Sequence, residues 1–472
     1  MRNIKLKDIG HGASPITKAT QLMNRLFFIS FVACVILFSG CSKLVEIGPP
    51  RNSISSTSVF TDQAGTNAAI AGMYASLYNY TTSYQYGISL LSGLQADEMV
   101  YNGTTWDQYK NNDLLSNESN VAGTWSGSYS GIYQANAIIE GVSSSNFPAA
   151  YKSQVTGEAL FMRAFCHFYL VNLFGDVPLT TSTSVLDNQQ KPRTPADQVY
   201  TQIITDLEEA EKLLPEAYPS GNNRTRVNKY AAAALLARVY LYQKNYKSAE
   251  AKATEVINAM SGSSLLYALP ADLSMVFLNA STETIWCFDD AIYGYTWVGG
   301  QTLPNTNVIP NFILLQGLQN AFEVGDKRKV SWVGVSAGQS YPYKYRTKTN
   351  VKQEYDVVLR LAEQYLIRAE ARALLNNIEG GQADVNVIRN RAGLQSLTLT
   401  ASSILPAIAQ ERRVELFSEW GHRWLDLKRT GKVDSVIGAL KPGLWQSTDA
   451  LYPIPLNDMS NNTNLVQNQG YF

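Results

Sequence analysis

The chain has 472 residues, of which 45% are hydrophobic and 17% are charged, so it is long enough to bury a large core. Basic and acidic residues number 39 each, which gives a formal net charge of zero. A balanced charge argues against a nucleic-acid-binding protein, because phosphate contacts need an excess of basic residues. The three His residues are far apart in sequence, so we expect neither a Cys/His metal site nor a cofactor.

Residues 1–40 have the pattern of a bacterial lipoprotein signal peptide. Arg25 precedes an apolar run at 26–38, which is shorter than the ~20 residues that a membrane-spanning helix needs. The run leads into Ser39-Gly40-Cys41, and small residues directly before a Cys resemble a lipobox. We therefore expect Cys41 to carry the lipid and to be the mature N-terminus. A plain secretory signal with an incidental Cys is the alternative, and Met23 is an alternative start.

The segment 41–59 is rich in Ser and contains two adjacent prolines, which is typical of a tether. We expect the folded body to begin at about Phe60. Within it we distinguish an N-terminal helical region, 60–280, from a C-terminal region, 281–472, that holds aromatic loops and the closing helices.

The body carries the apolar spacing of helices over long stretches, for example at 155–174 and 195–214. Small residues recur at a 12-residue spacing, as Ala237 with Ala249 and as Ala371 with Ala383. This spacing is typical of tetratricopeptide helix pairs, in which small residues let two antiparallel helices approach closely and neighbouring pairs stack. The sequence therefore predicts a mainly α fold.

Residues 281–345 differ from the rest of the chain. They are rich in aromatic residues, with Gly, Asn, Thr and Pro between them. The stretch 283–290 predicts a short buried strand, and the remainder predicts long loops, which in compact proteins are usually functional. The predicted architecture is a scaffold of tetratricopeptide-like helix pairs with long irregular loops and a few short strands on a ligand face.

Several segments point to a known family: 158–179, 360–375, 385–394, 411–432 and 451–471. In these segments and in their order, the chain resembles the SusD/RagB family of surface lipoproteins, which bind nutrients for Bacteroidetes-type bacteria. The resemblance implies a nutrient-binding protein of the outer membrane, lipid-anchored and facing the exterior. Its ligand is expected to be a glycan or oligosaccharide, delivered to a SusC-type TonB-dependent transporter. A family member that binds peptides or another nutrient stays open.

Two regions, 95–109 and 293–345, combine flat aromatic rings with amide and carboxylate side chains, the mixture that binds sugar rings and hydroxyls. The resemblance also implies that loops in these regions line the glycan site. Trp106, Trp297 and Trp332 are the candidates for stacking on a sugar. The further candidates for ligand binding are Tyr101, Asn102, Asp107, Tyr293, Tyr295, Tyr341 and Tyr343. For each aromatic residue, local packing is the alternative interpretation.

Two other classes of function are alternatives. A glycoside hydrolase needs two carboxylates across a cleft. The pairs Asp97-Glu98 and Asp289-Asp290 are adjacent in sequence, and neighbours on a strand point to opposite faces, so we expect no enzyme. A tetratricopeptide-type protein-binding scaffold without a small ligand remains the second alternative. The charged segment 411–429 predicts an ion-pair network along one helix, with Trp420 and Trp424 in the core.

Overall fold

The computed structural model describes residues 59–78, 84–221, 223–289 and 293–471, together with helical residues between Ile16 and Ser30. Residues 56–472 form one compact unit, and residues 1–55 form another. Cys41, the tether and most of the apolar run at 26–38 lie outside the described residues. Within the described residues, no helix is both long and apolar enough to cross a bilayer.

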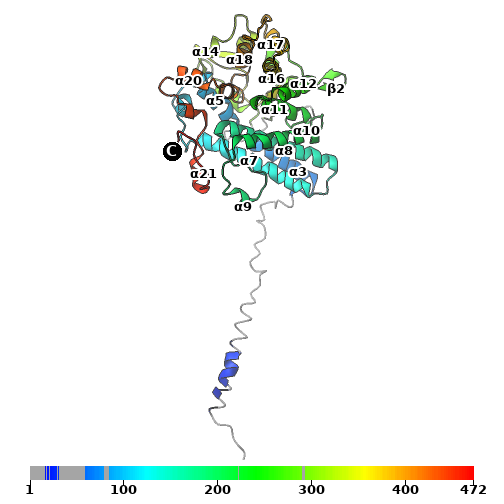
Figure 1. Ribbon diagram of the computed structural model, residues 1–472, viewed down its shortest axis with the longest axis vertical. Helices are drawn as coiled ribbons and strands as arrows, with labels where there is room; N and C mark the ends of the chain where they lie inside the picture. Colours follow the sequence, from blue (N-terminus) through cyan, green and yellow to red (C-terminus); the bar gives the residue numbers. More distant parts are fainter. Residues whose placement is uncertain are drawn as a thin grey trace, which may run out of the picture. The chain divides into compact units, whose positions relative to one another are not determined.

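The scaffold is a series of helices, each packed against the next along the chain. Figure 1 shows α7, α8, α10 and α11 lying side by side, with α12 and α16 continuing the stack. Helices that pack pairwise in this way bury faces that none could bury alone. The longer helices are α3 (Gln63–Leu77), α7 (Ser119–Ser143), α8 (Ala149–Phe174), α10 (Ala196–Leu213), α11 (Lys229–Tyr242), α12 (Tyr246–Ile257), α16 (Leu361–Leu374), α17 (Ile378–Arg391), α18 (Ile404–Glu415), α19 (His422–Arg429) and α20 (Val433–Leu440).

Short helices and two-stranded antiparallel ribbons connect this scaffold, so the predicted mainly α architecture is confirmed. The ribbons are β1 (Met99–Tyr101) with β5 (Phe312–Leu314), β2 (Met260–Ser261) with β3 (Ser264–Leu265), β4 (Thr284–Phe288) with β8 (Asp356–Arg360), and β6 (Val333–Ser336) with β7 (Gln339–Pro342). The short helices are α4 (Tyr84–Tyr86), η3 (Gly87–Leu91), α5 (Ser92–Gln95), α6 (Asp107–Asn111), α9 (Val185–Asn188), η4 (Leu273–Met275), α13 (Trp297–Thr302), α14 (Gln316–Gln319), α15 (Lys327–Trp332), η5 (Ser447–Ala450) and α21 (Leu456–Asn461).

The small residues of the predicted helix pairs lie mostly where the spacing places them. Ala237, Ala249 and Ala371 are completely buried. The prediction for Ala383 is wrong, because this residue is exposed on α17. Gly381 provides the close approach instead, since a Cβ there would lie 2.9 Å from the carbonyl oxygen of Ala369 on α16.

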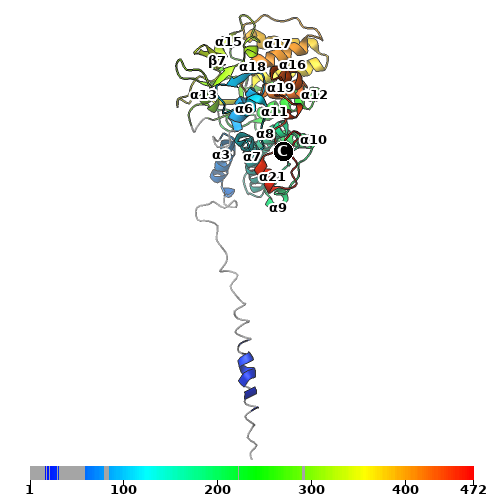
Figure 2. The same cartoon turned by 90° about the vertical axis from the view of Figure 1, so that its left-hand side faces the viewer.

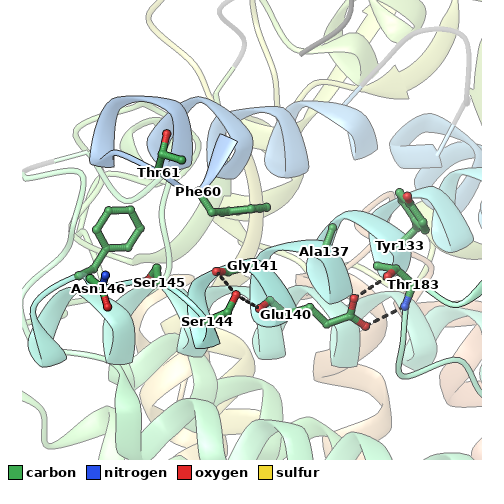
Figure 3. A pocket seen from close by; sticks show the side chains of 11 residues that line it. Phe60, Thr61, Tyr133, Ala137, Glu140, Gly141, Ser144, Ser145, Asn146 and Thr183 are labelled. Atoms are coloured by element: carbon green, nitrogen blue, oxygen red, sulfur yellow. Dashed lines mark hydrogen bonds between the residues drawn. The ribbon is translucent and has the colours of Figure 1, made fainter. Parts of the chain in front are cut away.

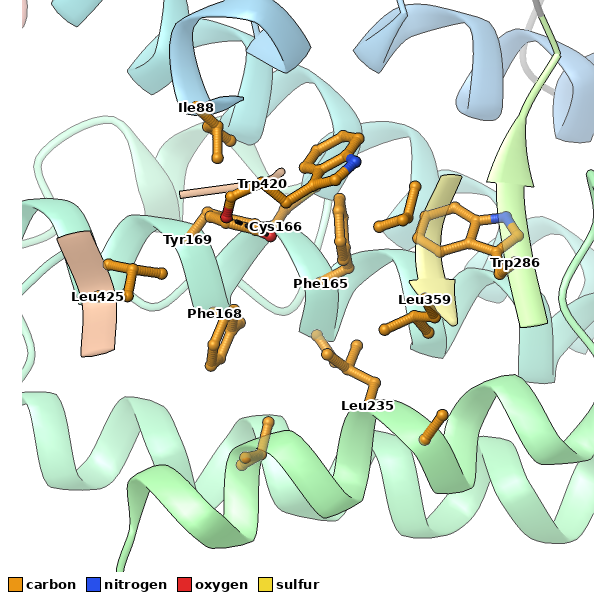
Figure 4. Packing of buried hydrophobic residues seen from close by; sticks show 14 of the residues in the cluster. Ile88, Phe165, Cys166, Phe168, Tyr169, Leu235, Trp286, Leu359, Trp420 and Leu425 are labelled. Atoms are coloured by element: carbon orange, nitrogen blue, oxygen red, sulfur yellow. Dashed lines mark hydrogen bonds between the residues drawn. The ribbon is translucent and has the colours of Figure 1, made fainter. Parts of the chain in front are cut away.

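One hydrophobic core runs through both sequence regions, from Ile70 to Leu465, and the division at 280/281 stays a prediction. The predicted buried strand is β4, whose five residues are all buried. Figure 4 shows Phe165 of α8 between two tryptophans, with ring centroids 5.0 Å from Trp286 and 5.7 Å from Trp420. The prediction that Trp420 lies in the core is therefore confirmed, as it is for the completely buried Trp424.

A buried network of charges lies beside this core. Arg360, at the end of β8, is 2% exposed and donates hydrogen bonds to Glu283 (2.8 Å), Glu415 (2.6 Å) and Glu419 (2.7 Å). The completely buried Arg328 of α15 pairs with Asp326, Glu411 and Glu415 at 2.8–3.2 Å. Buried charges need partners of this kind, because desolvation otherwise costs several kcal/mol per ion.

The prediction of a network along one helix is wrong in its geometry. Helix α18 ends at Glu415 and α19 begins at His422. Between them Ser418 and Trp420 have positive φ values of 57° and 38°, followed by Gly421 at 72°. The chain therefore turns sharply, and its charged side chains pair chiefly with residues on other elements.

We predict that Arg360→Met lowers the free energy of unfolding by roughly 3–5 kcal/mol, because it leaves three buried carboxylates without their shared cation. Lys212→Met is the control, since Lys212 and Glu209 form a pair at 3.3 Å with side chains 69% and 48% exposed. We expect a change of at most about 0.5 kcal/mol there. Chemical denaturation measures both values, and equal effects of the two substitutions would contradict the prediction.

Candidate functional site

The first group of candidate aromatic residues surrounds the β1–β5 ribbon. Tyr101 on β1 pairs with Phe312, and their ring centroids are 5.2 Å apart. Trp106 precedes α6 and packs edge-on against Tyr86 (5.7 Å), Tyr101 (6.3 Å) and Tyr109 (6.2 Å). Tyr109 is buried, whereas Tyr101 and Trp106 are half-buried. The buried rings thus support those of Tyr101 and Trp106, which keep part of their surface in solvent.

The second group lies at the start of α13. The Thr296 hydroxyl accepts a hydrogen bond from the Gly299 N–H (3.1 Å) and caps this helix. The Tyr293 ring lies 5.9 Å from Tyr295 and 5.3 Å from Trp297. All three rings are half-buried. Helix α13 contacts α4, the short helix that ends in Tyr86, so this group adjoins the first one.

The third group stands on the β6–β7 ribbon, and β7 contacts β5. The Tyr341 ring covers Gly334 so closely that a Cβ there would lie 2.3 Å from the ring. Its centroid is 5.8 Å from that of Tyr343, and the Arg346 guanidinium lies 5.4 Å from the Tyr343 ring. Both rings are half-buried, and burial raises the pKa of Tyr341.

Seven half-buried aromatic residues from three separate segments therefore adjoin through contacting elements, several of which Figure 2 labels. We call this surface the aromatic face: Tyr101, Trp106, Tyr293, Tyr295, Trp297, Tyr341 and Tyr343. Two polar candidates accompany it. Asn102 is exposed, and Asp107 is half-buried and pairs with Lys110 one helical turn away.

Trp332 does not belong to the aromatic face, and its prediction as a stacking residue is wrong. It is completely buried at the end of α15, and its indole N–H donates to the carbonyl oxygen of Leu273 (3.0 Å). Its ring lies 5.8 Å from Phe277 and 4.9 Å from the Lys344 ammonium. The sequence around Trp332 predicts a loop, but the structure has a short helix there, which turns this side chain inward.

Two carboxylates lie behind the aromatic face, directly before β1. Asp97 pairs with Arg423 (2.6 Å) and Arg413 (2.7 Å). Burial alone would raise the pKa of Asp97, but these two cations outweigh it and hold the pKa below its usual value. Both carboxylate oxygens are thus engaged by arginines, so Asp97 supplies no free catalytic base.

Glu98 is 3% exposed, and its carboxylate accepts one hydrogen bond, from the Ser418 N–H (3.2 Å). Burial, assisted by the charge of Asp97, raises the pKa of Glu98 to about 7. Lys344 is also buried, which lowers its pKa to about 8 although Glu419 opposes the shift. The sequence contained no signal for either shift, because burial by residues distant in the chain causes both, and the contacts with the turn at 415–419 oppose them.

Three hollows that the described residues line lie outside the aromatic face. One of about 640 Å³ lies beside α7, and another of about 670 Å³ is lined by residues of α16, α18, α19 and α20. A further hollow of about 340 Å³ lies beside Tyr74 and Phe288. None of these three contains a residue of the aromatic face. In the described part of the chain, no group of three or more His, Cys, Asp or Glu could hold a metal ion.

Comparisons with known proteins agree with this architecture. A family model described as starch-binding and associating with the outer membrane matches residues 51–241. The model of the SusD family matches residues 320–471. SusD-like protein P2 of Formosa agariphila is 28% identical, over 94% of this chain and 99% of the relative.

Solved structures show the same fold. A SusD superfamily protein from Bacteroides vulgatus has a TM-score of 0.76 at 20% identity, covering 87% of this chain and 100% of the other. A laminarin-binding SusD-like protein has a TM-score of 0.74 at 24% identity, with the same coverage.

We predict that Glu98→Gln changes the pH dependence of stability. The pKa of the Glu98 carboxyl is about 4.5 in the unfolded chain and about 7 in the folded protein. Because the folded state holds the proton more tightly, this group contributes stability that is fully present below pH 4.5. That contribution is lost as pH rises to about 7, by roughly 1.4 kcal/mol per pH unit. The stability of the variant relative to the wild-type protein should therefore rise from pH 5 to 7 and stay constant at higher pH. Thermal midpoints measure this, and a difference between the two proteins that does not vary with pH would refute the prediction.

Proposed function

The chain belongs to the SusD/RagB family, and we propose that it is a cell-surface lipoprotein that binds a glycan or oligosaccharide as a nutrient. The observation that carries this proposal is the aromatic face. Three segments far apart in sequence each contribute half-buried rings to adjoining elements of one surface. The description of the matching family model as starch-binding supports the same ligand class, as does the laminarin-binding neighbour.

The aromatic face offers the two kinds of contact that a sugar needs. Flat rings pack against the C–H faces of a pyranose and bury apolar area without a large loss of side-chain entropy. The exposed amide of Asn102 and the carboxylate of Asp107 border the Tyr101 and Trp106 rings and can hydrogen-bond to hydroxyl groups. The guanidinium of Arg346 lies beside Tyr343. These polar groups are few, which favours a neutral or weakly charged glycan.

We assign the protein a role in binding and delivery, without catalysis. The carboxylates at or behind the aromatic face are Asp107, which pairs with Lys110, Asp97, held by two arginines, and Glu98, which is buried. None of them is placed to act with a partner across a cleft. Binding at the cell surface becomes useful when the ligand passes onward, so a SusC-type TonB-dependent transporter is the proposed partner. Lipidation at Cys41 would hold the protein on the outer face of the outer membrane.

A protein-binding scaffold is the second candidate, and one observation favours it. The hollow of about 670 Å³ near α16 and α18 is lined by the apolar side chains of Leu374, Leu405 and Val436 together with several charged groups. A groove of this kind on stacked helices suits a peptide segment. The aromatic face distinguishes the two functions, because a peptide scaffold would not depend on it.

We predict that Trp106→Ala and Trp297→Ala each weaken glycan binding at least about tenfold, because truncation removes the stacking surface. Affinity gel electrophoresis against a polysaccharide panel headed by laminarin and starch measures the effect. Trp445→Ala is the matched control, since Trp445 is also half-buried but packs against Trp424 outside the aromatic face. Trp332→Ala should instead destabilise the fold, by roughly 3–5 kcal/mol. Retained binding in both aromatic-face variants would exclude this site.

We predict that Cys41→Ala releases the protein from membranes, because it removes the acyl chains that would hold the body there. Fractionation of cells that lack the transporter measures this without interference from a protein partner. Ser39→Ala is the control, since another small residue at that position keeps the lipobox pattern. Membrane retention of the Cys41 variant at the wild-type level would rule out lipid anchoring at this residue.

A further inference from the structure

We propose that the hollow between α7 and the segment directly before α3 is a second carbohydrate-binding site, separate from the aromatic face. This inference rests on the proposed function. We call it the α7 hollow. It has a volume of about 640 Å³ and is lined by Phe60, Thr61, Tyr133, Ala137, Glu140, Gly141, Ser144, Ser145, Asn146, Phe147 and Thr183. None of these residues belongs to the aromatic face.

The floor of the α7 hollow is an aromatic ring laid against a helix. Gly141 has no side chain, and a Cβ at that position would lie 2.1 Å from the Phe60 ring. Ala137, one turn earlier on the same face of α7, is also small. Figure 3 shows the Phe60 ring edge-on above this strip of α7. The small residues thus make room for a flat apolar surface at the base of the hollow.

Two further aromatic residues border this floor. Tyr133 is 56% exposed on α7, and in the described part of the chain its ring has no aromatic partner and its hydroxyl no hydrogen bond. Phe147 packs edge-on against Tyr151, with centroids 5.3 Å apart. The strip from Tyr133 to Ser144, the residue that caps the end of α7, covers 12 residues, or roughly 16 Å. This length accommodates a short run of sugar units.

The polar lining of the α7 hollow is almost uncharged. Among the described residues that line it, Glu140 is the only one with an ionisable side chain apart from the Tyr133 phenol. The Glu140 carboxylate accepts hydrogen bonds from the N–H (2.9 Å) and the hydroxyl of Thr183, as Figure 3 shows. It therefore holds the loop that forms one wall. Ser144, Asn146 and Thr183 contribute hydroxyl and amide groups. No basic side chain is among the described lining residues, although the Lys152 ammonium donates to the backbone carbonyl oxygens of Ser143 and Ser145 (2.9 Å each) at one end of the hollow.

This chemistry selects one kind of occupant. An anionic ligand would meet the Glu140 carboxylate, while the Lys152 ammonium beside the hollow is already bound to two carbonyl oxygens. A purely apolar ligand would cover this carboxylate and the lining hydroxyl oxygens without hydrogen-bonding to them. A neutral carbohydrate satisfies both the aromatic and the polar parts. Because the aromatic face would hold the same polymer elsewhere on the body, a second contact raises the effective concentration of the chain at each site. The α7 hollow would then favour long glycans over short ones.

Tyr133→Ala tests the proposal, because this exposed side chain can be removed without loss of core packing. Ala137→Trp is a second variant that fills the α7 hollow, and Tyr133→Phe keeps the ring. The control is Leu444→Ala, since Leu444 is 52% exposed and lines neither surface. Thermal midpoints confirm that each variant folds. The probes are the polysaccharide that the wild-type protein retains best from a panel headed by laminarin and starch, and the hexasaccharide of the same glycan.

We expect Tyr133→Ala and Ala137→Trp to bind the polysaccharide roughly tenfold more weakly, which corresponds to the loss of one stacking contact. Tyr133→Phe and Leu444→Ala should bind it like the wild-type protein. The hexasaccharide should bind all four variants equally but bind Trp106→Ala at least about tenfold more weakly. Wild-type affinity of Tyr133→Ala and Ala137→Trp for the polysaccharide would overturn the second site and leave the proposed function intact. Equal weakening toward both probes would show that the two surfaces are not separate. A wild-type protein that retains no glycan of the panel would overturn both.

Discussion

The pairing of buried arginines with buried glutamates is the constraint on which the rest of this structure depends. Arg360 joins three carboxylates from two parts of the chain, Glu283 before β4 and Glu415 and Glu419 near the turn that follows α18. A buried cation tolerates few arrangements, because any lost partner leaves an uncompensated charge. The network therefore fixes how the β4–β8 ribbon, α15 and α18 lie against one another. Packing of the hydrophobic core alone would leave more freedom.

The buried ion-pair network sets the orientation of the aromatic face. Along 341–344, buried and half-buried residues alternate, as they do in an extended segment with one face on a core. The Lys344 ammonium is held inside by Glu419 and by the carbonyl oxygen of Glu415. The Tyr341 and Tyr343 rings are consequently turned outward. On the other side of the face, Asp97 and Glu98 attach the chain before β1 to Arg423 and Ser418, so the same turn positions the strand that carries Tyr101.

This arrangement separates the charges that stabilise the fold from the surface that we propose binds the ligand. The charges that hold the body together are buried behind the aromatic face, and the rings that it presents to solvent carry little charge. Loops that vary in aromatic content could then change the ligand without disturbing the scaffold, because their anchoring residues lie inside. The α7 hollow follows the same plan on a smaller scale: Glu140 and Asn136 hold the loop at 180–183 in place, whereas Phe60, Tyr133 and Phe147 provide the rings.

The sequence by itself determined the helical scaffold, the buried strand at β4 and the core positions of Trp420 and Trp424, because hydrophobic periodicity reports directly which face of an element is buried. It also located the two regions that supply the aromatic face. Only the tertiary structure decided which rings reach solvent. Trp332 and Trp297 both lie in stretches that predict loops, yet a short helix turns Trp332 into the charged network, while α13 leaves Trp297 half-buried. The same reason explains why Ala383 is exposed and why the charged segment is not one helix. Contacts between residues distant in sequence decide whether a single side chain is buried, and local spacing does not predict these contacts.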